Sequence, residues 1–498
     1  MPRKPFPLNH AQHDRAVGAL LSTAVGDALG AGHVPTTPDA SAGPVGITAP
    51  GEWTDAAATA IAVAEIASFD TNLTAPQRLD DLVQRWAWWA RTAKAVGPQT
   101  AAVLAAIDGD AAGHVAGVVG AEKFHDAAAA LYVDTGGTLD ATCLTRAVPI
   151  ALASLGPQDE SSAIRTARTL CGLTHAGPDA AEATVLLTLA IRHAVLTGEL
   201  DIGIGLPHLE ANRRDVWSAR IVETEWAQQA DVAQATDDVV GVLQAAWSAI
   251  TTTPVPQQDP RNGIFRADHL RLALEAAVRG GGHTATVGAV TGGLLGAAYG
   301  ASAIPWQWRT IVRGWPGLRA HGLSGLADKI VNGGEPCRLP SIGWWRDEPD
   351  PRLYPHDDGV WIGVAARLEK LPPDIEAVVS LRPVPDEDMP AGVLHLEVRL
   401  ADDAGNETGA DAHLDFVLLD TVRAIEALRA AGVTVFLHGH ATRSRAPAVA
   451  ALYGARRAGI DIDQALAEVC AVLPDANPGD PLRAALHRLS PATERSAR

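Results

Sequence analysis

Positive charge and cysteine are both scarce in this sequence, and each shortage excludes a class of protein. The 498 residues include 40 Lys and Arg against 58 Asp and Glu, a formal net charge of -18. Because a nucleic-acid-binding face needs clustered basic side chains, we expect no nucleic-acid partner. The four cysteines lie far apart and show no CxxC spacing. This excludes a zinc ribbon or a disulfide framework and fits a reducing compartment.

Long apolar runs are scarce as well. Residues 1–10 include basic side chains, but no apolar run follows them, so we expect no secretory signal and a cytoplasmic protein. Residues 284–305 are uncharged, but their glycines, alanines and threonines make them too weakly apolar for a membrane span. We therefore expect no membrane partner.

What the sequence does contain is a glycine turn that runs directly into a small-residue helix. The turn is Gly280-Gly281-Gly282, and the uncharged stretch after it extends to Gly296. Small side chains let neighbouring backbones approach closely, so this helix is expected to be buried. The turn in front of it is then held at the centre of the domain, where we expect a ligand site.

The first two-thirds of the chain shows the apolar periodicity and the alanine content of helices. No convincing alternating strand precedes about residue 355. We predict an all-α domain over residues 10–332, with helices at 14–30, 56–68, 77–95, 99–107, 121–133, 143–155, 161–174, 180–197, 239–250 and 266–279.

The chain changes character over residues 333–355, where glycines, prolines and Trp344-Trp345 predict a linker between domains. Beyond it, short β-rich runs at 360–364, 377–381, 393–400 and 433–437 alternate with helices at 415–431, 447–458 and 462–472. This alternation predicts a second domain over residues 356–490, an α/β domain with a central, largely parallel sheet. The protein is therefore predicted to be multidomain.

Five segments of the first domain carry a family resemblance. They are residues 15–31, which contain Gly26-Asp27, then Gly51-Glu52-Trp53-Thr54-Asp55, residues 144–149, Leu173-Thr174-His175, and residues 281–288. In this order, over about residues 10–330, they resemble the ADP-ribosylglycohydrolase family. The resemblance implies a helical hydrolase that removes ADP-ribose, with a pair of Mg²⁺ ions held between the second segment and the last.

The sequence departs from the family where that chemistry takes place. The family motifs read Thr-Asp-Asp-Thr and Gly-Asp-Thr-Asp-Thr, because hard divalent ions need several carboxylate oxygens. An acidic residue expected near His33-Val34 is absent. The matching positions are Thr54, Asp55 and Thr286, and the replaced ones are Ala56, Ala57, His283 and Ala285.

One carboxylate and two hydroxyls cannot neutralise two Mg²⁺ ions in a buried site. We therefore predict that magnesium-dependent hydrolysis is lost and that no cofactor is needed. Mg²⁺ would bind only if the vestigial site at Thr54, Asp55 and Thr286 retained affinity. Two alternatives stay open: Asp55 and His283 could hold one softer metal, or Thr54 and Asp55 could simply cap helix 56–68.

The second domain carries its own motif in residues 433–447, a strand, a tight loop and a helix start. This segment, with Arg445 as the arginine, resembles the His-Cys-x5-Arg phosphate loop of dual-specificity and tyrosine phosphatases, and the resemblance extends over about residues 355–490. Backbone N–H groups at a helix N-terminus and a guanidinium would form an oxyanion cage. The resemblance implies a ligand-binding loop made of His438, His440, Ala441, Thr442, Ser444 and Arg445.

Here too the residue that breaks bonds is missing. Gly439 occupies the position of the nucleophilic cysteine, so thiolate hydrolysis is excluded. Asp402, with Asp403 as the weaker choice, stands where the general acid would be and is then vestigial. Anion binding survives this loss. The alternative for Arg445 is a structural arginine that ties the loop to the helix, and Arg443 is assigned to the surface.

Both predicted centres lack the groups that break bonds but keep the surrounding scaffold. The first hypothesis is a catalytically impaired protein, a pseudoenzyme that binds an ADP-ribose-like or phosphate-bearing small molecule, or a protein partner. The second is a working hydrolase that removes ADP-ribose from proteins or small molecules with an altered metal site. The third is a purely structural interaction module.

Overall fold

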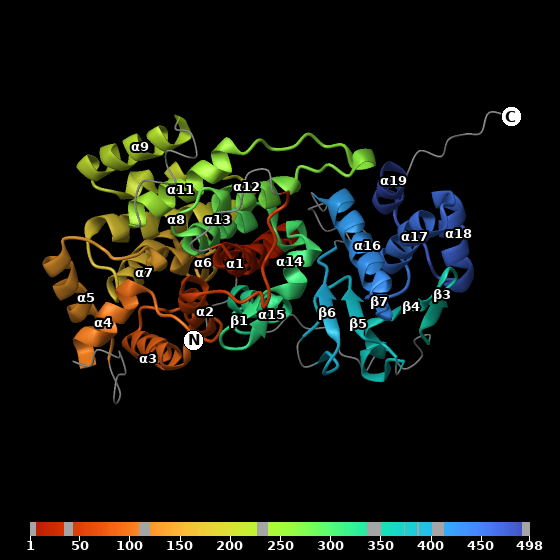
Figure 1. The fold of residues 1–498 in the computed structure, drawn as a ribbon, viewed down its shortest axis with the longest axis horizontal. Helices are drawn as coiled ribbons and strands as arrows, with labels where there is room; N and C mark the ends of the chain where they lie inside the picture. Colours follow the sequence, from red (N-terminus) through yellow and green to blue (C-terminus); the bar gives the residue numbers. More distant parts are fainter. Residues whose placement is uncertain are drawn as a thin grey trace.

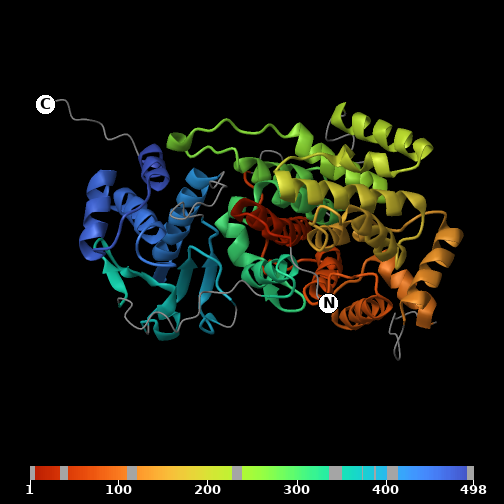
Figure 2. The same ribbon diagram turned by 180° about the vertical axis from the view of Figure 1, so that it is seen from behind.

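The computed structural model describes residues 6–33, 43–108, 120–226, 238–335, 350–372, 374–385, 388–400 and 413–490. A helical N-terminal domain and a C-terminal α/β domain pack side by side (Figures 1 and 2). The predicted fold class, an all-α domain followed by an α/β domain, is confirmed.

The N-terminal domain is built almost entirely of helices. They are α1 (His10–Ala31), α2 (Asp55–Ala67), α3 (Pro76–Thr92), α4 (Pro98–Asp108), α5 (Ala121–Thr135), α6 (Ala147–Leu152), α7 (Glu160–Gly172), α8 (Pro178–Thr197), α9 (Ala211–Trp226), α11 (Val239–Thr252), α12 (Asp268–Arg279), α13 (Thr284–Tyr299), α14 (Trp306–Ile311) and α15 (Ala320–Val331). By length and composition α8 could cross a membrane, but 67% of its apolar window is buried inside the protein, as in a core helix.

Two local predictions for this domain are wrong. The single helix predicted over 143–155 is a 3-10 helix, Thr142–Arg146, followed by α6. Pro149 has no N–H to donate to residue 145, so one α-helical ladder cannot run through this segment. The domain also contains strands: β1 (Arg313–Gly314) and β2 (Leu318–Arg319) pair antiparallel around a Trp-Pro-Gly turn.

The small-residue helix predicted from the sequence lies at the centre of the domain. It is α13, and it runs antiparallel to α1 with the two backbones in contact. A Cβ added to Gly26 would lie 1.9 Å from the carbonyl oxygen of Gly288, and one added to Gly288 would lie 2.3 Å from that of Gly26. The hydroxyl of Thr284 donates to the Gly30 carbonyl at 2.9 Å. Any larger residue would separate these helices.

The C-terminal domain has a five-stranded sheet with the order β3-β4-β7-β5-β6. Its elements are β3 (Arg352–Tyr354), β4 (Asp357–Val364), β5 (Ala377–Ser380), β6 (Leu394–Glu397), α16 (Leu414–Ala430), β7 (Val435–Gly439), α17 (Arg445–Ala458), α18 (Ile462–Val472) and α19 (Asp480–Leu489). Only β3 is antiparallel to its neighbour, so the predicted largely parallel sheet is confirmed. β3 lies inside the stretch predicted as a linker, and Trp344-Trp345 lie outside the described residues.

Two buried ion pairs join the domains. Arg399, just after β6, donates from both Nη atoms to the carboxylate of Asp328 on α15, at 3.2 and 2.5 Å. Arg309 on α14 donates to Asp420 on α16 at 2.9 Å and to the carbonyl of Glu397 at 2.6 Å. All four of these charged side chains are buried. Because a buried charge is costly without its partner, these pairs favour a single docked arrangement of the two domains.

Candidate functional site

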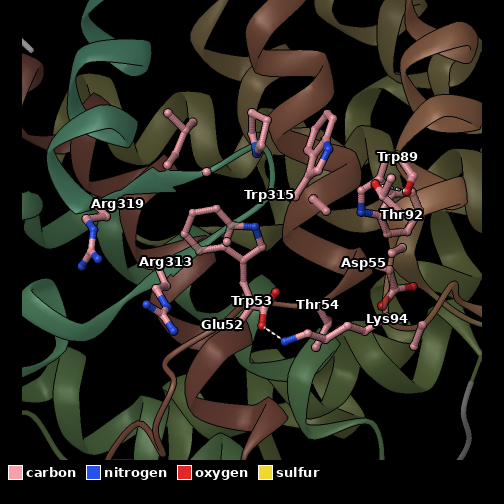
Figure 3. Close-up of a pocket in the computed structure, with 17 residues that line it drawn as sticks. Glu52, Trp53, Thr54, Asp55, Trp89, Thr92, Lys94, Arg313, Trp315 and Arg319 are labelled. Atoms are coloured by element: carbon pink, nitrogen blue, oxygen red, sulfur yellow. Dashed lines mark hydrogen bonds and ion pairs between the residues drawn. The ribbon is translucent and has the colours of Figure 1, made fainter.

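A cleft of about 640 Å³ opens at the N-terminus of α2, where the resemblance placed the first metal-binding segment. Three indoles line it together with basic side chains from the β1–β2 ribbon and the end of α3 (Figure 3). Its lining includes the side chains of Glu52, Trp53, Thr54, Asp55, Trp89, Lys94, Arg313, Trp315 and Arg319. Glu52 forms an ion pair with Lys94 across the cleft.

The N-terminus of α2 is capped from another helix. Asp27, fully buried on α1, accepts hydrogen bonds from Thr54 N at 2.9 Å, from Thr54 Oγ1 at 2.7 Å and from Ala57 N at 2.7 Å. Thr54 is the N-cap residue by position, but its own side chain makes no capping bond. Burial raises the pKa of Asp27 to about 7, against the lowering effect of these donors. The two helices that carry the first two motifs are therefore locked together.

Asp55 lies beside a second carboxylate that the sequence interpretation overlooked. A Cβ added to Gly97 would lie 2.2 Å from Asp55 Oδ2 and 3.0 Å from Asp140 Oδ2, so both carboxylate oxygens lie close to this glycine. Burial raises the pKa of Asp55, and the nearby charge of Asp140 raises it further. This corner of the site is tightly packed.

Asp140 is fully engaged by donors. It accepts from Gln99 N at 2.9 Å, from Thr142 N at 2.9 Å and from Thr142 Oγ1 at 2.8 Å, and His175 Nε2 lies 3.0 Å away. Burial alone would raise the pKa of Asp140, but the hydrogen bond from His175 and the backbone donors of Thr142 and Gln99 lower it. Burial lowers the pKa of His175. The Thr174 hydroxyl lies 2.7 Å from His175 Nδ1, so the arrangement fits a neutral histidine that carries its proton on Nε2.

These residues do not fit a pair of Mg²⁺ ions. Thr286 is buried in the first turn of α13 and His283 is half-buried, and neither lines the cleft. The oxygens of Asp27 and Asp140 already accept hydrogen bonds from N–H and O–H groups. Within the residues that the structure describes, no group of three or more His, Cys, Asp or Glu side chains could hold a metal ion.

The second candidate site is the loop between β7 and α17, at the carboxyl end of the central strand. A Cβ added to Gly439 would lie 3.4 Å from the Ala441 carbonyl oxygen and 4.0 Å from Ala446 N, which is ordinary contact. Arg445 Nη1 donates to the carbonyls of Leu381 and Leu400, both at 2.9 Å. One end of this guanidinium thus ties the loop to the ends of β5 and β6.

His438 lies behind this loop instead of lining it. Its side chain is fully buried, with Nε2 2.7 Å from Ser380 Oγ and Nδ1 3.2 Å from the Gly439 carbonyl oxygen. His395 Nε2 lies 2.8 Å from the same serine hydroxyl. Burial lowers the pKa of His438 to about 4. This neutral histidine supports the backbone of the loop.

The remaining loop residues vary in exposure. Arg443 is exposed, in agreement with its assignment to the surface, while Thr442 and Ser444 are buried. Ser444 Oγ has no hydrogen-bond partner within the described part of the chain. His440 Nδ1 lies 2.6 Å from Arg382 Nη1, and Ala441 is half-buried. Asp402 and Asp403 lie outside the described residues.

A family model for ADP-ribosylglycohydrolase matches residues 8–339 of this chain. The chain belongs to the ADP-ribosylglycohydrolase family. No curated protein matches this sequence.

Solved structures resemble the N-terminal and the C-terminal parts of this family member. An ADP-ribosylglycohydrolase-related protein complex is 27% identical, covers 65% of this chain and 99% of its own, and has a TM-score of 0.46. A mouse dual-specificity phosphatase is 27% identical over 29% of this chain and 89% of its own, with a TM-score of 0.25. Human DUSP28 is 24% identical over 28% and 94%, with a TM-score of 0.24. The phosphatases match the C-terminal portion.

Two parts of the glycohydrolase cleft could have been found in the sequence. Asp140-Ala141-Thr142 has an acidic residue just before a helical segment, a pattern typical of a carboxylate that caps backbone N–H groups. Trp315-Pro316-Gly317 is a turn signal between two short runs, which indicates a hairpin. The contact between Asp55 and Asp140 carries no sequence signal, because 85 residues separate them.

Proposed function

We propose that this ADP-ribosylglycohydrolase family member binds an ADP-ribosyl ligand in the cleft at Asp55 without hydrolysing it. The observation behind this proposal is that Asp55 is the one carboxylate among the described cleft residues that forms no ion pair, since Glu52 pairs with Lys94. A single acceptor can hydrogen-bond to ribose hydroxyls. It cannot assemble the cage of carboxylates that divalent ions require.

We propose a second, separate binding function for the C-terminal loop. It binds a phosphate-type oxyanion through backbone N–H groups at the start of α17 and does not turn it over. The glycine at position 439 supports the loss of turnover, since it offers no nucleophile. We place the protein in the cytoplasm, where ADP-ribosyl and phosphate ligands are available.

Calorimetric titration of the full chain with ADP-ribose tests the cleft. We expect binding that is unchanged by Mg²⁺ or Mn²⁺. An Asp55→Asn variant should bind about tenfold more weakly, because a hydrogen bond to a charged oxygen becomes one to a neutral amide oxygen. Release of ADP-ribose from modified arginine or serine peptides would contradict the proposal and favour a working hydrolase. If the protein bound no phosphate-bearing ligand, the result would favour the hypothesis of a purely structural interaction module.

For the C-terminal loop, the measurement is thermal stabilisation by inorganic phosphate. We expect the stabilisation to disappear in Arg445→Ala and to persist in Arg443→Ala, the matched control at an exposed arginine of the same loop. Stabilisation that persisted in a folded Arg445→Ala protein would remove the anion-pocket assignment.

A further inference from the structure

Two arginines with the same charge face each other at the edge of the cleft. Arg313 on β1 and Arg319 on β2 are directly paired in the antiparallel register of the ribbon. Both side chains are exposed, and within the described residues neither guanidinium has a hydrogen-bond or ion-pair partner. Like charges placed directly opposite in a ribbon are destabilising. The pair therefore acts against the stability of the ribbon that carries it.

The ribbon cannot relieve this repulsion by moving its backbone freely. Arg313 N donates to the Gly51 carbonyl at 2.9 Å, and Trp53 N donates to the Arg313 carbonyl at 3.1 Å. A Cβ added to Gly314 would lie 2.4 Å from the Trp53 ring, so the strand rests directly on that indole. At the turn, the ring of Trp315 packs 5.9 Å from that of Trp88. These contacts therefore fix the position of the ribbon backbone that carries the two arginines.

No carboxylate of the cleft lining forms an ion pair with these two arginines. Lys94, the remaining cation of the lining, is paired with Glu52, and the whole chain is acidic. In the view of Figure 3, Arg313 and Arg319 lie on one side of the Trp53 ring and Asp55 lies on the other. A ligand that lay across Trp53 would thus meet two guanidinium groups at one end and a carboxylate at the other.

We propose that Arg313 and Arg319 form a clamp for the diphosphate of a nucleoside-diphosphate-type ligand whose ribose reaches Asp55. This inference rests on the proposed function and assigns the diphosphate part of the ligand to two residues of the ribbon. A diphosphate places two anionic groups next to each other and matches two adjacent guanidinium groups, which bind phosphate oxygens bidentately. The cleft of about 640 Å³ has the volume of a small-molecule site. Trp53, Trp89 and Trp315 supply flat aromatic surface for the remainder of the ligand.

The repulsion within the pair gives the clamp a distinctive signature. Arg319→Glu replaces a like-charge pair with an opposite-charge pair and should leave the melting temperature of the free protein unchanged or raise it. The same change should weaken binding of ADP-ribose and of inorganic pyrophosphate by at least tenfold, because it puts a negative charge against the diphosphate. Arg319→Gln, a neutral second variant, should weaken both by about tenfold.

Titration calorimetry of the full chain with ADP-ribose, pyrophosphate and AMP provides the test, with Arg168→Ala as control. Arg168 is an exposed arginine on α7, away from the cleft, and its loss should change nothing. AMP, with one phosphate, should lose less affinity than ADP-ribose in the Arg319 variants. The C-terminal loop is untouched in all variants, so differences between them report on the ribbon.

The outcomes separate the clamp from the proposed function. If ADP-ribose bound wild type and a folded Arg319→Glu protein equally, the clamp would be overturned and the proposed function would stand. If wild type bound no ADP-ribose, the proposed function would fail, and pyrophosphate would decide about the clamp. Pyrophosphate binding that depended on Arg319 would then support it, and binding that was absent or independent of Arg319 would overturn it.

Discussion

The two domains each differ from the motif that they resemble, with Ala56 in one and Gly439 in the other, and the space around the two positions differs. In the N-terminal domain the carboxylates are packed closely, and a Cβ on Gly97 would collide with Asp55 at 2.2 Å. In the C-terminal domain a Cβ on Gly439 meets no atom closer than 3.4 Å. The corner formed by Gly97, Asp55 and Asp140 is closed, although the cleft on the other side of Asp55 is open. The C-terminal loop keeps an open position where a nucleophile would stand.

The difference follows from what holds each site in shape. The N-terminal site is held by side chains, since Asp27 and Asp140 satisfy backbone and hydroxyl donors on neighbouring elements. The C-terminal loop is held by backbone geometry and by groups behind it, chiefly His438. A site held by side chains changes shape when they are replaced, whereas a loop held from behind tolerates the loss of a side chain at its front.

Restoring the lost acidic residue of the N-terminal motif should have the largest effect. Ala56 is fully buried and its carbonyl accepts from Thr145 Oγ1 at 2.6 Å. Ala56→Asp places a carboxylate in a fully buried position, and we expect a loss of about 3 kcal/mol of unfolding free energy in urea denaturation. Ala285→Asp, at a half-buried position, should cost under about 1 kcal/mol. An Ala56→Asp protein that was fully stable, and further stabilised by Mg²⁺, would show that the site remains open.

Acidification should act next most strongly, through the C-terminal domain. The pKa of His438 falls from 6.5 to about 4 on folding because the ring is buried, so the unfolded chain binds more protons between these values. The stability contribution is fully present above pH 6.5 and is lost as the pH falls toward 4, at up to about 1.4 kcal/mol per pH unit. Asp27 has the opposite sign, since its raised pKa means that stability is lost as the pH rises through about 7.

Urea denaturation at a series of pH values measures this effect. Below pH 6.5, His438→Gln should reduce the slope of unfolding free energy against pH by the contribution of one proton. The control is His487→Gln, at an exposed histidine of α19 in the same domain, which should leave this slope unchanged. An unchanged slope in His438→Gln would mean that the ring is accessible to protons in the folded state.

The smallest effect is expected where the nucleophile is put back. Gly439→Cys fits the space beside Ala441 and needs no left-handed backbone, so we expect a change in unfolding free energy below about 1 kcal/mol. The new thiol should react with a thiol reagent, because the start of a helix favours the thiolate. The control is Gly97→Cys, which should unfold the N-terminal site. If the two variants were equally stable, the space at Gly97 would be no more closed than the space at Gly439.

Much of this molecule could be predicted from local patterns. The run of small residues predicted a buried helix. α13 is buried against α1, because glycines at facing positions let the two helix backbones come into contact. The alternation of short β-rich runs with helices predicted the parallel sheet around β7. The split of the segment 143–155 could have been foreseen, since Pro149 interrupts the helical hydrogen bonds.

The candidate sites were predictable only in part. Thr54 and Asp55 do line the cleft, but Thr286 and His283 do not. Likewise His438 belongs to the support of the loop, although its place in the motif suggested a ligand contact. A motif specifies which residues are near in sequence, and the direction of each side chain depends on the elements packed around it.

The amino-acid sequence by itself determined the family, the order of the two folds and the residue types at the motif positions, because these are properties of residue type and spacing. Only the tertiary structure decided that Asp140 lies against Asp55, that Arg313 and Arg319 share one edge of a cleft, and that Arg399 is buried against Asp328. Each of these contacts joins residues that are distant along the chain or lie on strands too short to predict, so it depends on how helices and strands pack and not on any local pattern.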